Sequence, residues 1–361
     1  MRRGAAVRLA GAGRLAGAVA AGFVVALAVA APAGAHSADV PVASDYRCAV
    51  TGISPPLPGL TVRAVTAGTQ LELVNHTGRS IEVLGYTGEP YLVVGPDGVY
   101  QNASSPATYL NETLTGGVTP PATASASAVP AWQRLSATPA VLWHDHRAHW
   151  MSATLPPAVA ADPGTPHPVS HWTVPLRDGV NRFTVTGTLD WVPRPAPAVW
   201  WAGSLLLAAA VAGLGLLRSA RAVPIAGGVA AGTGLAALGY AIGAAADSGA
   251  LGPAGVLRSL VTGQPWSLLC GMAALAAGWY ALRNRSAADL ALGLSGACLA
   301  LFAGASNAGV FAHSVAPVPL AGDLARTLIL VCVGAGAGLA GMTALRMRAS
   351  AMHTSAMHGR Q

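Results

Sequence analysis

Five apolar runs in the second half of the chain constrain its fold more than any other feature. They cover residues 198–217, 222–244, 266–282, 287–312 and 324–345. Each run is close to the ~20 residues that an α-helix needs to cross a hydrocarbon core. Only 10% of the 361 residues are charged, against roughly one quarter in ordinary soluble domains. The pattern predicts a bundle of about five transmembrane helices over residues 198–346.

Arginine pairs follow alternate runs and predict how the chain crosses the membrane. The pairs follow the first, third and fifth runs and are Arg218 and Arg221, Arg283 and Arg285, and Arg346 and Arg348. Because basic residues that flank membrane helices stay in the cytoplasm, we expect the N-terminal domain outside the cell membrane and the C-terminus inside. These arginines also account for much of the net charge of +7, so the sequence predicts no nucleic-acid partner.

The first 35 residues have the layout of a signal peptide. Basic residues precede an apolar stretch from Leu15 to Ala31, and Ala33-Gly34-Ala35 matches the small-x-small pattern that signal peptidase accepts. Cleavage there would make His36 the first residue. An α-amine and an imidazole on one residue chelate Cu(II), which favours nitrogen ligands. Without cleavage the segment is a further membrane anchor, and His36 has no such role.

Residues 36–195 alternate apolar and polar positions in several short segments. The clearest lie at 61–65, 70–74, 80–84 and 182–191. Turn signals separate them, and a stretch rich in Pro, Ala, Ser and Thr from Gly116 to Pro130 is typical of a loop. Short strands with regular turns predict a β-sandwich. The predicted order is therefore a signal peptide (1–35), an extracytoplasmic β domain (36–195), the transmembrane bundle (198–346) and a disordered cytoplasmic tail (347–361).

The highest density of potential metal-ligating side chains occurs in the segment Trp143-His144-Asp145-His146-Arg147-Ala148-His149-Trp150-Met151. On a regular strand His144 and His146 face one side, while His149 and Met151 face the other. One strand therefore cannot place all three imidazoles on one ion. Either two of them bind a metal, or the chain turns near Arg147.

Imidazole and thioether groups in this segment favour copper, with zinc as the second choice. The candidate ligands are His36, His144, His146, His149 and Met151, with His76, His167 and His171 as further donors. Seven of the ten histidines lie in the predicted exported domain. In the alternative interpretation the flanking tryptophans only pack, and the histidines pair with Asp145 and backbone carbonyls. Cys48 has no exported partner for a disulfide and is buried, reactive or a ligand, of which burial is the commonest.

The layout resembles the copper-resistance membrane proteins of the CopC/CopD and YcnJ type. The resemblance lies in the histidine after A-x-A, the segment around His144 and His146, and the joined membrane domain. Phe311-Ala312-His313 is also similar to a CopD helix junction, although Arg326 stands where a further histidine is expected. The resemblance implies copper handling in the envelope, with a copper chaperone or an oxidase-assembly protein as partner. The layout is similar to actinobacterial membrane proteins as well, which implies no mechanism.

Three functions are compatible with these residues. The first is an envelope copper-binding protein that captures the metal with its exported domain. The alternative is a non-metal interaction or sensory module on a membrane anchor. The third is an enzyme such as a copper oxidase with an N-terminal histidine brace, but no nucleophile–base pair or acid pair supports it. The chain has no P-loop pattern, which argues against an ATP-driven pump.

Sulfur-containing residues also occur within the apolar runs, and they are Cys270, Met272, Cys298, Cys332 and Met342. Thiolate and thioether groups are soft ligands suited to Cu(I). Buried cysteine and methionine more often serve as apolar packing, so packing is the role we expect of them.

Overall fold

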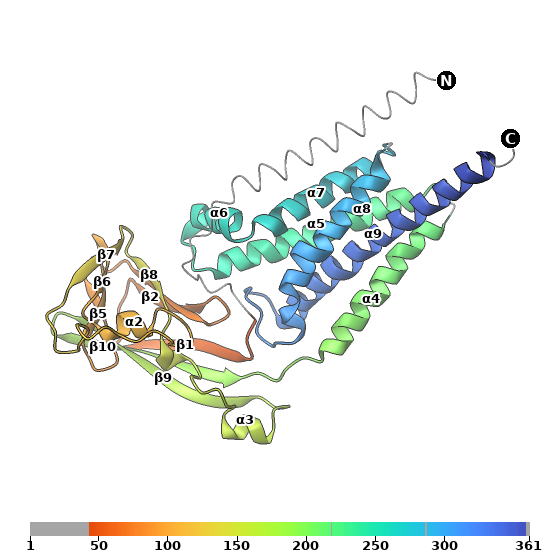
Figure 1. The fold of residues 1–361 in the computed structure, drawn as a ribbon. Coiled ribbons are helices and arrows are strands. Elements are labelled where there is room, and N and C mark those ends of the chain that lie inside the picture. The colour runs from red at the N-terminus through yellow and green to blue at the C-terminus, as the bar shows by residue number, and fades with distance from the viewer. Residues whose placement is uncertain (1–42, 218, 286, 359–361) are drawn as a thin grey trace.

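The computed structural model describes residues 43–217, 219–285 and 287–358, so the predicted signal peptide and His36 lie outside the described residues. Figure 1 shows a β-rich domain at one end of an elongated bundle of helices. The last strand of the β domain ends at Trp191, and the first long helix begins at Pro197. The predicted order of a β-rich domain followed by a helical bundle is confirmed.

The bundle contains five helices long and apolar enough to cross a membrane. They are α4 (Pro197–Gly213) with η2 (Leu214–Leu216), α5 (Ala222–Asp247), α7 (Pro265–Leu282), α8 (Ala288–Cys298) with η3 (Leu299–Gly304) and η4 (Ala305–Phe311), and α9 (Gly322–His358). These bounds confirm the five predicted runs. Helix α9 continues through His358, so the expectation of a disordered tail from residue 347 is wrong up to that residue.

Small residues let the long helices approach closely. A Cβ added to Gly278 of α7 would lie 2.6 Å from the carbonyl oxygen of Gly227 in α5, and the same distance separates an added Cβ at Gly296 of α8 from the Gly336 oxygen of α9. Such backbone contact is the usual basis of helix association in membranes. Many large apolar side chains of the bundle face outward, as Leu206 does with 73% exposure, which suits a lipid environment.

Helix α6 (Gly252–Gly263) was not predicted. It joins α5 to α7 at the end of the bundle that faces the β domain (Figure 1). None of its residues is buried, and Leu257 and Val261 are exposed. Twelve residues are too few for a membrane span, so the search for long apolar runs passed over it.

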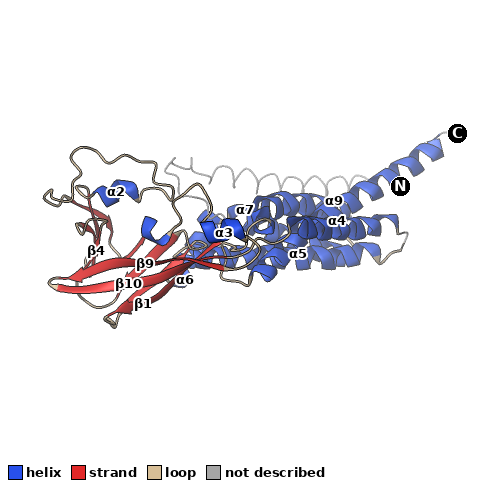
Figure 2. Ribbon diagram, turned by 90° about the horizontal axis from the view of Figure 1, so that it is seen from below, coloured by secondary structure: helices blue, strands red, loops and turns tan. Residues whose placement is uncertain are grey.

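The β domain consists of ten strands in two antiparallel sheets. The larger sheet has the order β1 (Tyr46–Ser54), β10 (Asn181–Trp191), β9 (His167–Asp178), β4 (Ile81–Leu84), β5 (Pro90–Gly95), β6 (Gly98–Asn102) and β7 (Trp132–Ser136). The smaller sheet has the order β2 (Leu60–Val65), β3 (Gln70–Asn75) and β8 (Ala140–Trp143). Figure 2 shows β1, β9 and β10 as long neighbouring strands. The four predicted strands correspond to β2, β3, β4 and β10.

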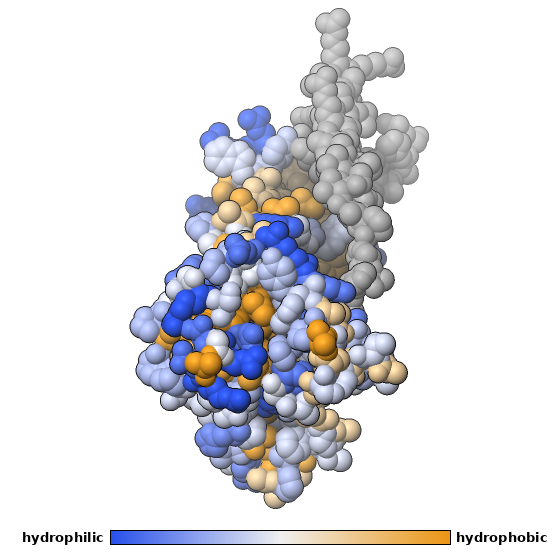
Figure 3. Space-filling model, turned by 90° about the vertical axis from the view of Figure 1, so that its left-hand side faces the viewer, coloured by the Kyte–Doolittle hydropathy of each residue, from blue (hydrophilic) through white to orange (hydrophobic). Residues whose placement is uncertain are grey.

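One hydrophobic core joins the two sheets. Leu73 and Val141 come from the smaller sheet, and Leu92, Leu176 and Val185 come from the larger one. Three short helices lie outside the sheets, namely α2 (Pro106–Leu110), η1 (His146–Ala148) and α3 (Pro157–Ala161). The predicted loop from residue 116 to 130 contains neither helix nor strand. Figure 3 views the β-domain end of the molecule, where hydrophilic residues surround a few hydrophobic patches.

The β domain is fastened to the bundle beside the start of β1. Asp45 is buried, and its carboxylate accepts hydrogen bonds from Arg194 Nε at 2.7 Å, His313 Nδ1 at 3.0 Å and Ser314 N at 3.2 Å. Ser44 and Val315 exchange two backbone hydrogen bonds of 3.0 and 2.7 Å. Residues before and after the β domain therefore meet the loop between η4 and α9.

A second fastening joins the β2–β3 turn to the end of α5. The backbone N–H of Thr66 donates to the carbonyl oxygen of Asp247 at 2.8 Å, and that of Ala67 donates to the Asp247 carboxylate at the same distance. Both fastenings lie at the end of the bundle opposite the arginine-bearing connections (Figure 1). At that opposite end, Arg346 pairs with Asp289 at 2.9 Å and ties α9 to the start of α8.

Candidate functional site

The histidine-rich segment leaves β8 at Trp143 and turns through η1. The predicted turn near Arg147 is therefore present. Asp145 caps it, because its carboxylate accepts from the backbone N–H of Arg147 at 3.2 Å. The same carboxylate accepts from Arg147 Nε at 2.8 Å and Nη2 at 2.7 Å, and from Trp143 Nε1 at 3.0 Å. The Asp145 side chain is 0% exposed and that of Arg147 is 18% exposed, so this ion pair is largely buried.

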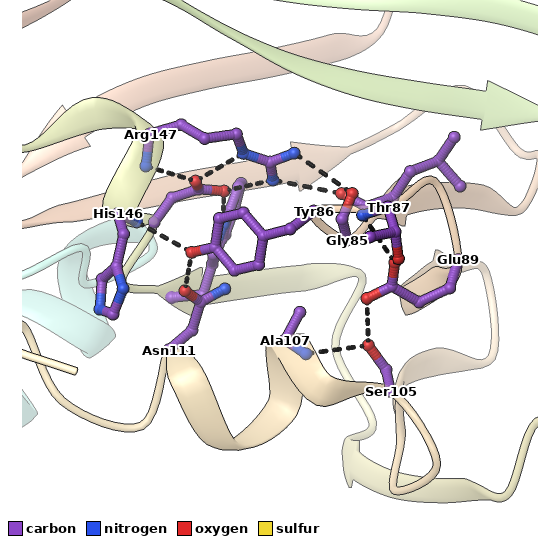
Figure 4. A network of polar contacts seen from close by, with 12 residues as sticks. Gly85, Tyr86, Thr87, Glu89, Ser105, Ala107, Asn111, His146 and Arg147 are labelled. Carbon is purple, nitrogen blue, oxygen red and sulfur yellow. Dashed lines mark hydrogen bonds and ion pairs between the residues drawn. The ribbon is translucent and has the colours of Figure 1, made fainter. Parts of the chain in front are cut away.

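Arg147 connects the turn to the larger sheet. Its guanidinium lies 5.0 Å from the ring centre of Tyr86 and donates to the carbonyl oxygen of Leu84 at 3.1 Å. The Tyr86 hydroxyl donates to Asn111 Oδ1 and accepts from the backbone N–H of His146 at 3.1 Å. Figure 4 shows this network between the Tyr86 turn, α2 and η1. Its contacts hold the segment in one position, which is a structural role.

His144 and His146 each hydrogen-bond to a backbone carbonyl. Nδ1 of His144 donates to the oxygen of Thr69 at 2.7 Å, and Nε2 of His146 donates to that of Thr113 at 3.0 Å. The donors are assigned from the accepting carbonyls. Metal-bound histidines commonly use their second nitrogen in this way. The contacts of His146 therefore fit both the metal site and the alternative in which the rings pair with carbonyls, whereas Nε2 of His144 also contacts the Gln70 side chain at 3.5 Å.

His149 differs from its two neighbours. Its Nε2 is buried and has no hydrogen-bond partner within the described part of the chain. Burial, together with the nearby His144 and His146 rings, lowers the pKa of His149 to about 4. The imidazole is therefore neutral at physiological pH. A neutral, buried nitrogen without a partner is costly as pure packing and is suited to bind a metal.

A cavity of about 400 Å³ lies beside His149. Its wall contains three groups that ligate soft metals, the imidazole of His149, the thioether of Met151 and the thiol of Cys48. The other lining residues are Ser44, Tyr46, Ala67, Gly68, Thr69, Leu114, Thr115, Trp150, Ser152, Ala153 and Leu189. Ser44, Tyr46 and Ala67 adjoin or belong to the two fastenings, so the cavity lies where the β domain meets the bundle.

The two sulfur groups of the cavity are in different environments. Cys48 of β1 is buried, and burial raises the pKa of its thiol to about 12, which a hydrogen bond with Trp172 partly offsets. This thiol has to release a proton before it becomes a thiolate ligand. Met151 is 43% exposed, so its thioether is accessible from solvent without any change of fold.

The other predicted donors lie elsewhere. Nε2 of His167 donates to the carbonyl oxygen of Asp162 at 2.6 Å, and neither His76 nor His171 lines the cavity. Within residues 43–217, 219–285 and 287–358, no three His, Cys, Asp or Glu side chains are grouped to hold one ion. The structure thus brings Cys48, His149 and Met151 to one cavity, while His144 and His146 occupy neighbouring positions on the same segment.

The metal-free protein should lose stability as the pH falls from about 6.5 to about 4, the ordinary and the folded-state pKa of His149. In this window the unfolded chain binds a proton that the folded state does not bind, so the free energy of unfolding decreases as the pH falls. Thermal unfolding of the β domain, followed by tryptophan fluorescence in the detergent-solubilised full chain, measures the effect.

The variant His149→Gln should flatten this dependence, and His167→Gln, at a half-buried position outside the cavity, is the control. An equal pH dependence in the wild type and the His149 variant would show that this ring does not resist protonation.

Comparisons with protein-family models, with curated proteins and with solved structures found no match to this chain. The proposal that follows therefore depends on the chemistry of the chain itself.

Proposed function

We propose that this protein binds copper at the outer face of the cell membrane, in the cavity of its β domain. The observation that carries the proposal is the shared cavity of Cys48, His149 and Met151, in which the Nε2 of His149 has no partner among the described residues. Thiol, thioether and imidazole groups together favour copper, above all Cu(I), with zinc as the second choice. The function is copper capture for homeostasis rather than catalysis.

The orientation belongs to the same proposal. The β domain is extracytoplasmic and the C-terminus cytoplasmic, because the arginines gather at the end of the bundle away from the β domain. Two sheets around a common core support the interpretation of the domain as a β-sandwich. Copper reaches such a domain from a copper chaperone or leaves it for an oxidase-assembly protein.

Three other histidines contribute around this cavity. Burial and the neighbouring His144 and His146 rings keep His149 neutral, and in their neutral form the two rings are further imidazole donors on the same segment. His36 precedes the cavity residue Ser44 by eight positions, and an extended chain of that length reaches up to about 27 Å. An N-terminal His36 therefore has the reach to add its α-amine and imidazole when Cu(II) is bound.

Copper titration of the full chain with an authentic His36 terminus tests the proposal. The double variant His149→Gln with Met151→Leu should weaken Cu(I) binding at least tenfold, measured by competition with a chromophoric chelator. Both replacements keep side-chain size, so the β domain should stay folded. The variant Met272→Leu, which removes a thioether from the lipid-facing side of α7, is the matched control.

The double variant His144→Ala with His146→Ala separates the two roles of these rings. Loss of copper retention would make them ligands, and a smaller loss of affinity would make them supporting residues. Unchanged affinity and stoichiometry in both double variants would overturn the copper proposal. It would favour the second candidate, a non-metal interaction module, for which the carbonyl contacts of His144 and His146 are the specific support.

A further inference from the structure

Three of the four cysteines gather inside the helical bundle. Cys270 of α7, Cys298 at the end of α8 and Cys332 of α9 belong to one hydrophobic cluster. All of them are free thiols, and Cys332 is 0% exposed. They come from three different helices, so this grouping is a property of the fold and not of their spacing in the sequence.

Two of the thiols belong to neighbouring helices. Cys270 and Cys298 lie close enough for their side chains to interact, and Cys332 is near enough to Cys270 to interact with it electrostatically. Met272 of α7 and Met342 of α9 are not part of the cluster. Met272 is 55% exposed toward the lipid side, and Met342 packs in a separate core.

Two irregular features lie beside the cysteine cluster, one after Cys298 and one near Cys332. Cys298 is the last residue of α8, and the chain continues as the π-helix η3 and the 3-10 helix η4 before Phe311. Short π-helical turns inside longer helices are frequent at functional sites. The hydroxyl of Tyr240 is buried close to Cys332 and has no hydrogen-bond partner among the described residues. A polar group without a partner in the bundle is costly, which points to a ligand rather than to pure packing.

We propose that Cys270 and Cys298 form a Cu(I) site inside the bundle, with Cys332 beside it. The proposal rests on the proposed function for the identity of the metal and adds a second site to it. Two sulfur ligands suffice for Cu(I), whereas structural zinc takes four ligands. Binding releases a proton from each thiol that becomes a thiolate. One thiolate and one neutral thiol give an uncharged complex, which avoids the cost of burying a charge.

The position of the pair relates it to the cavity of the β domain. Cys270 lies five residues after Pro265, the first residue of α7, which is roughly 8 Å along the helix at about 1.5 Å per residue. That end of α7 faces the β domain (Figure 1). An ion that leaves the cavity beside His149 therefore meets the thiol pair in the near half of the bundle, and we assign the pair as an intermediate binding position for Cu(I).

Cu(I) titration of the reduced, detergent-solubilised full chain tests this site. The wild type should bind one more Cu(I) than Cys270→Ala with Cys298→Ala, and Met272→Leu, two residues along the same helix, should equal the wild type. The cavity variant His149→Gln with Met151→Leu should keep the bundle ion. The absence of copper binding at one of the two sites therefore does not imply its absence at the other. Equal stoichiometry in the wild type and the double cysteine variant would overturn the proposal.

A measurement on the wild type covers the case in which the cysteine variants do not fold. A small maleimide that enters detergent micelles labels the thiols, and mass spectrometry compares the labelling at each cysteine with and without Cu(I). Bound Cu(I) should protect Cys270 and Cys298 from labelling by the maleimide, also in the variant in which His149 and Met151 of the cavity are replaced. Labelling of the pair that is equal with and without Cu(I) would contradict the site.

Discussion

Replacing Asp145 by alanine should lower the stability of the β domain by about 3–5 kcal/mol, the usual cost of removing one partner from a buried ion pair. The loss leaves the Arg147 guanidinium without its two carboxylate contacts, and it leaves Trp143 Nε1 without an acceptor. It also removes the cap of η1, which is the turn that leads to His149. Chemical denaturation of the full chain, followed by tryptophan fluorescence, measures the effect.

Two further variants separate loss of the ion pair from loss of packing. Glu82→Gln breaks the more exposed pair with Arg177 and should cost at most about 1 kcal/mol. The combination of Asp145→Ala with Arg147→Leu should recover part of the loss, because no unpaired charge then remains buried. A stability equal to that of the wild type in Asp145→Ala would show that the network of Figure 4 does not hold the histidine segment.

The variant Gly187→Ala should be among the most disruptive single-methyl changes in the β domain. Gly187 of β10 lies directly opposite Trp172 of β9. An added Cβ would overlap the indole ring of Trp172 and the backbone oxygen of Ala49 on the other side. Overpacking of this kind commonly costs about 1–3 kcal/mol, and more when backbone is involved. Because Trp172 hydrogen-bonds with Cys48, the change should also weaken copper binding.

Gly117→Ala is the matched control, since an added Cβ there meets nothing within 4 Å. Thermal unfolding and copper titration of the two alanine variants should therefore differ clearly. Similar unfolding temperatures would mean that β9 and β10 move apart at low cost, which would contradict the tight packing of Trp172 over Gly187.

The long apolar helices were predictable because the thickness of the hydrocarbon core sets the length of a continuous apolar run, and arginines mark where such runs end. Both signals can be read from neighbouring residues alone. The predicted run 222–244 and the observed α5 (Ala222–Asp247) differ by only a few residues. Strand alternation likewise identified β2, β3, β4 and β10. Helix α6 was missed because the search for apolar runs of membrane-spanning length excludes a helix that is too short to cross a membrane.

The candidate site was predictable only in part. The local motif identified His149 and Met151 as candidate ligands, and a turn at Arg147 was one of the two alternatives that the sequence left open. Cys48 is about 100 positions earlier in the chain, and only the pairing of β1 with β10 brings it to the same cavity. The carbonyl partners of His144 and His146 come from loops whose course depends on the whole domain. The gathering of Cys270, Cys298 and Cys332 depends in the same way on helix packing.

The two fastenings at Asp45 and Asp247 have a mechanical consequence. A metal-binding domain on a long flexible linker samples a wide volume and can transfer its metal to many partner proteins. Here one fastening lies next to the β1 side of the cavity and the other next to its β2–β3 side, so the cavity cannot swing away from the bundle. Under the proposed copper function, any donor or acceptor of the metal therefore has to come to this molecule. The β domain changes its position only with the lateral movement of the whole protein.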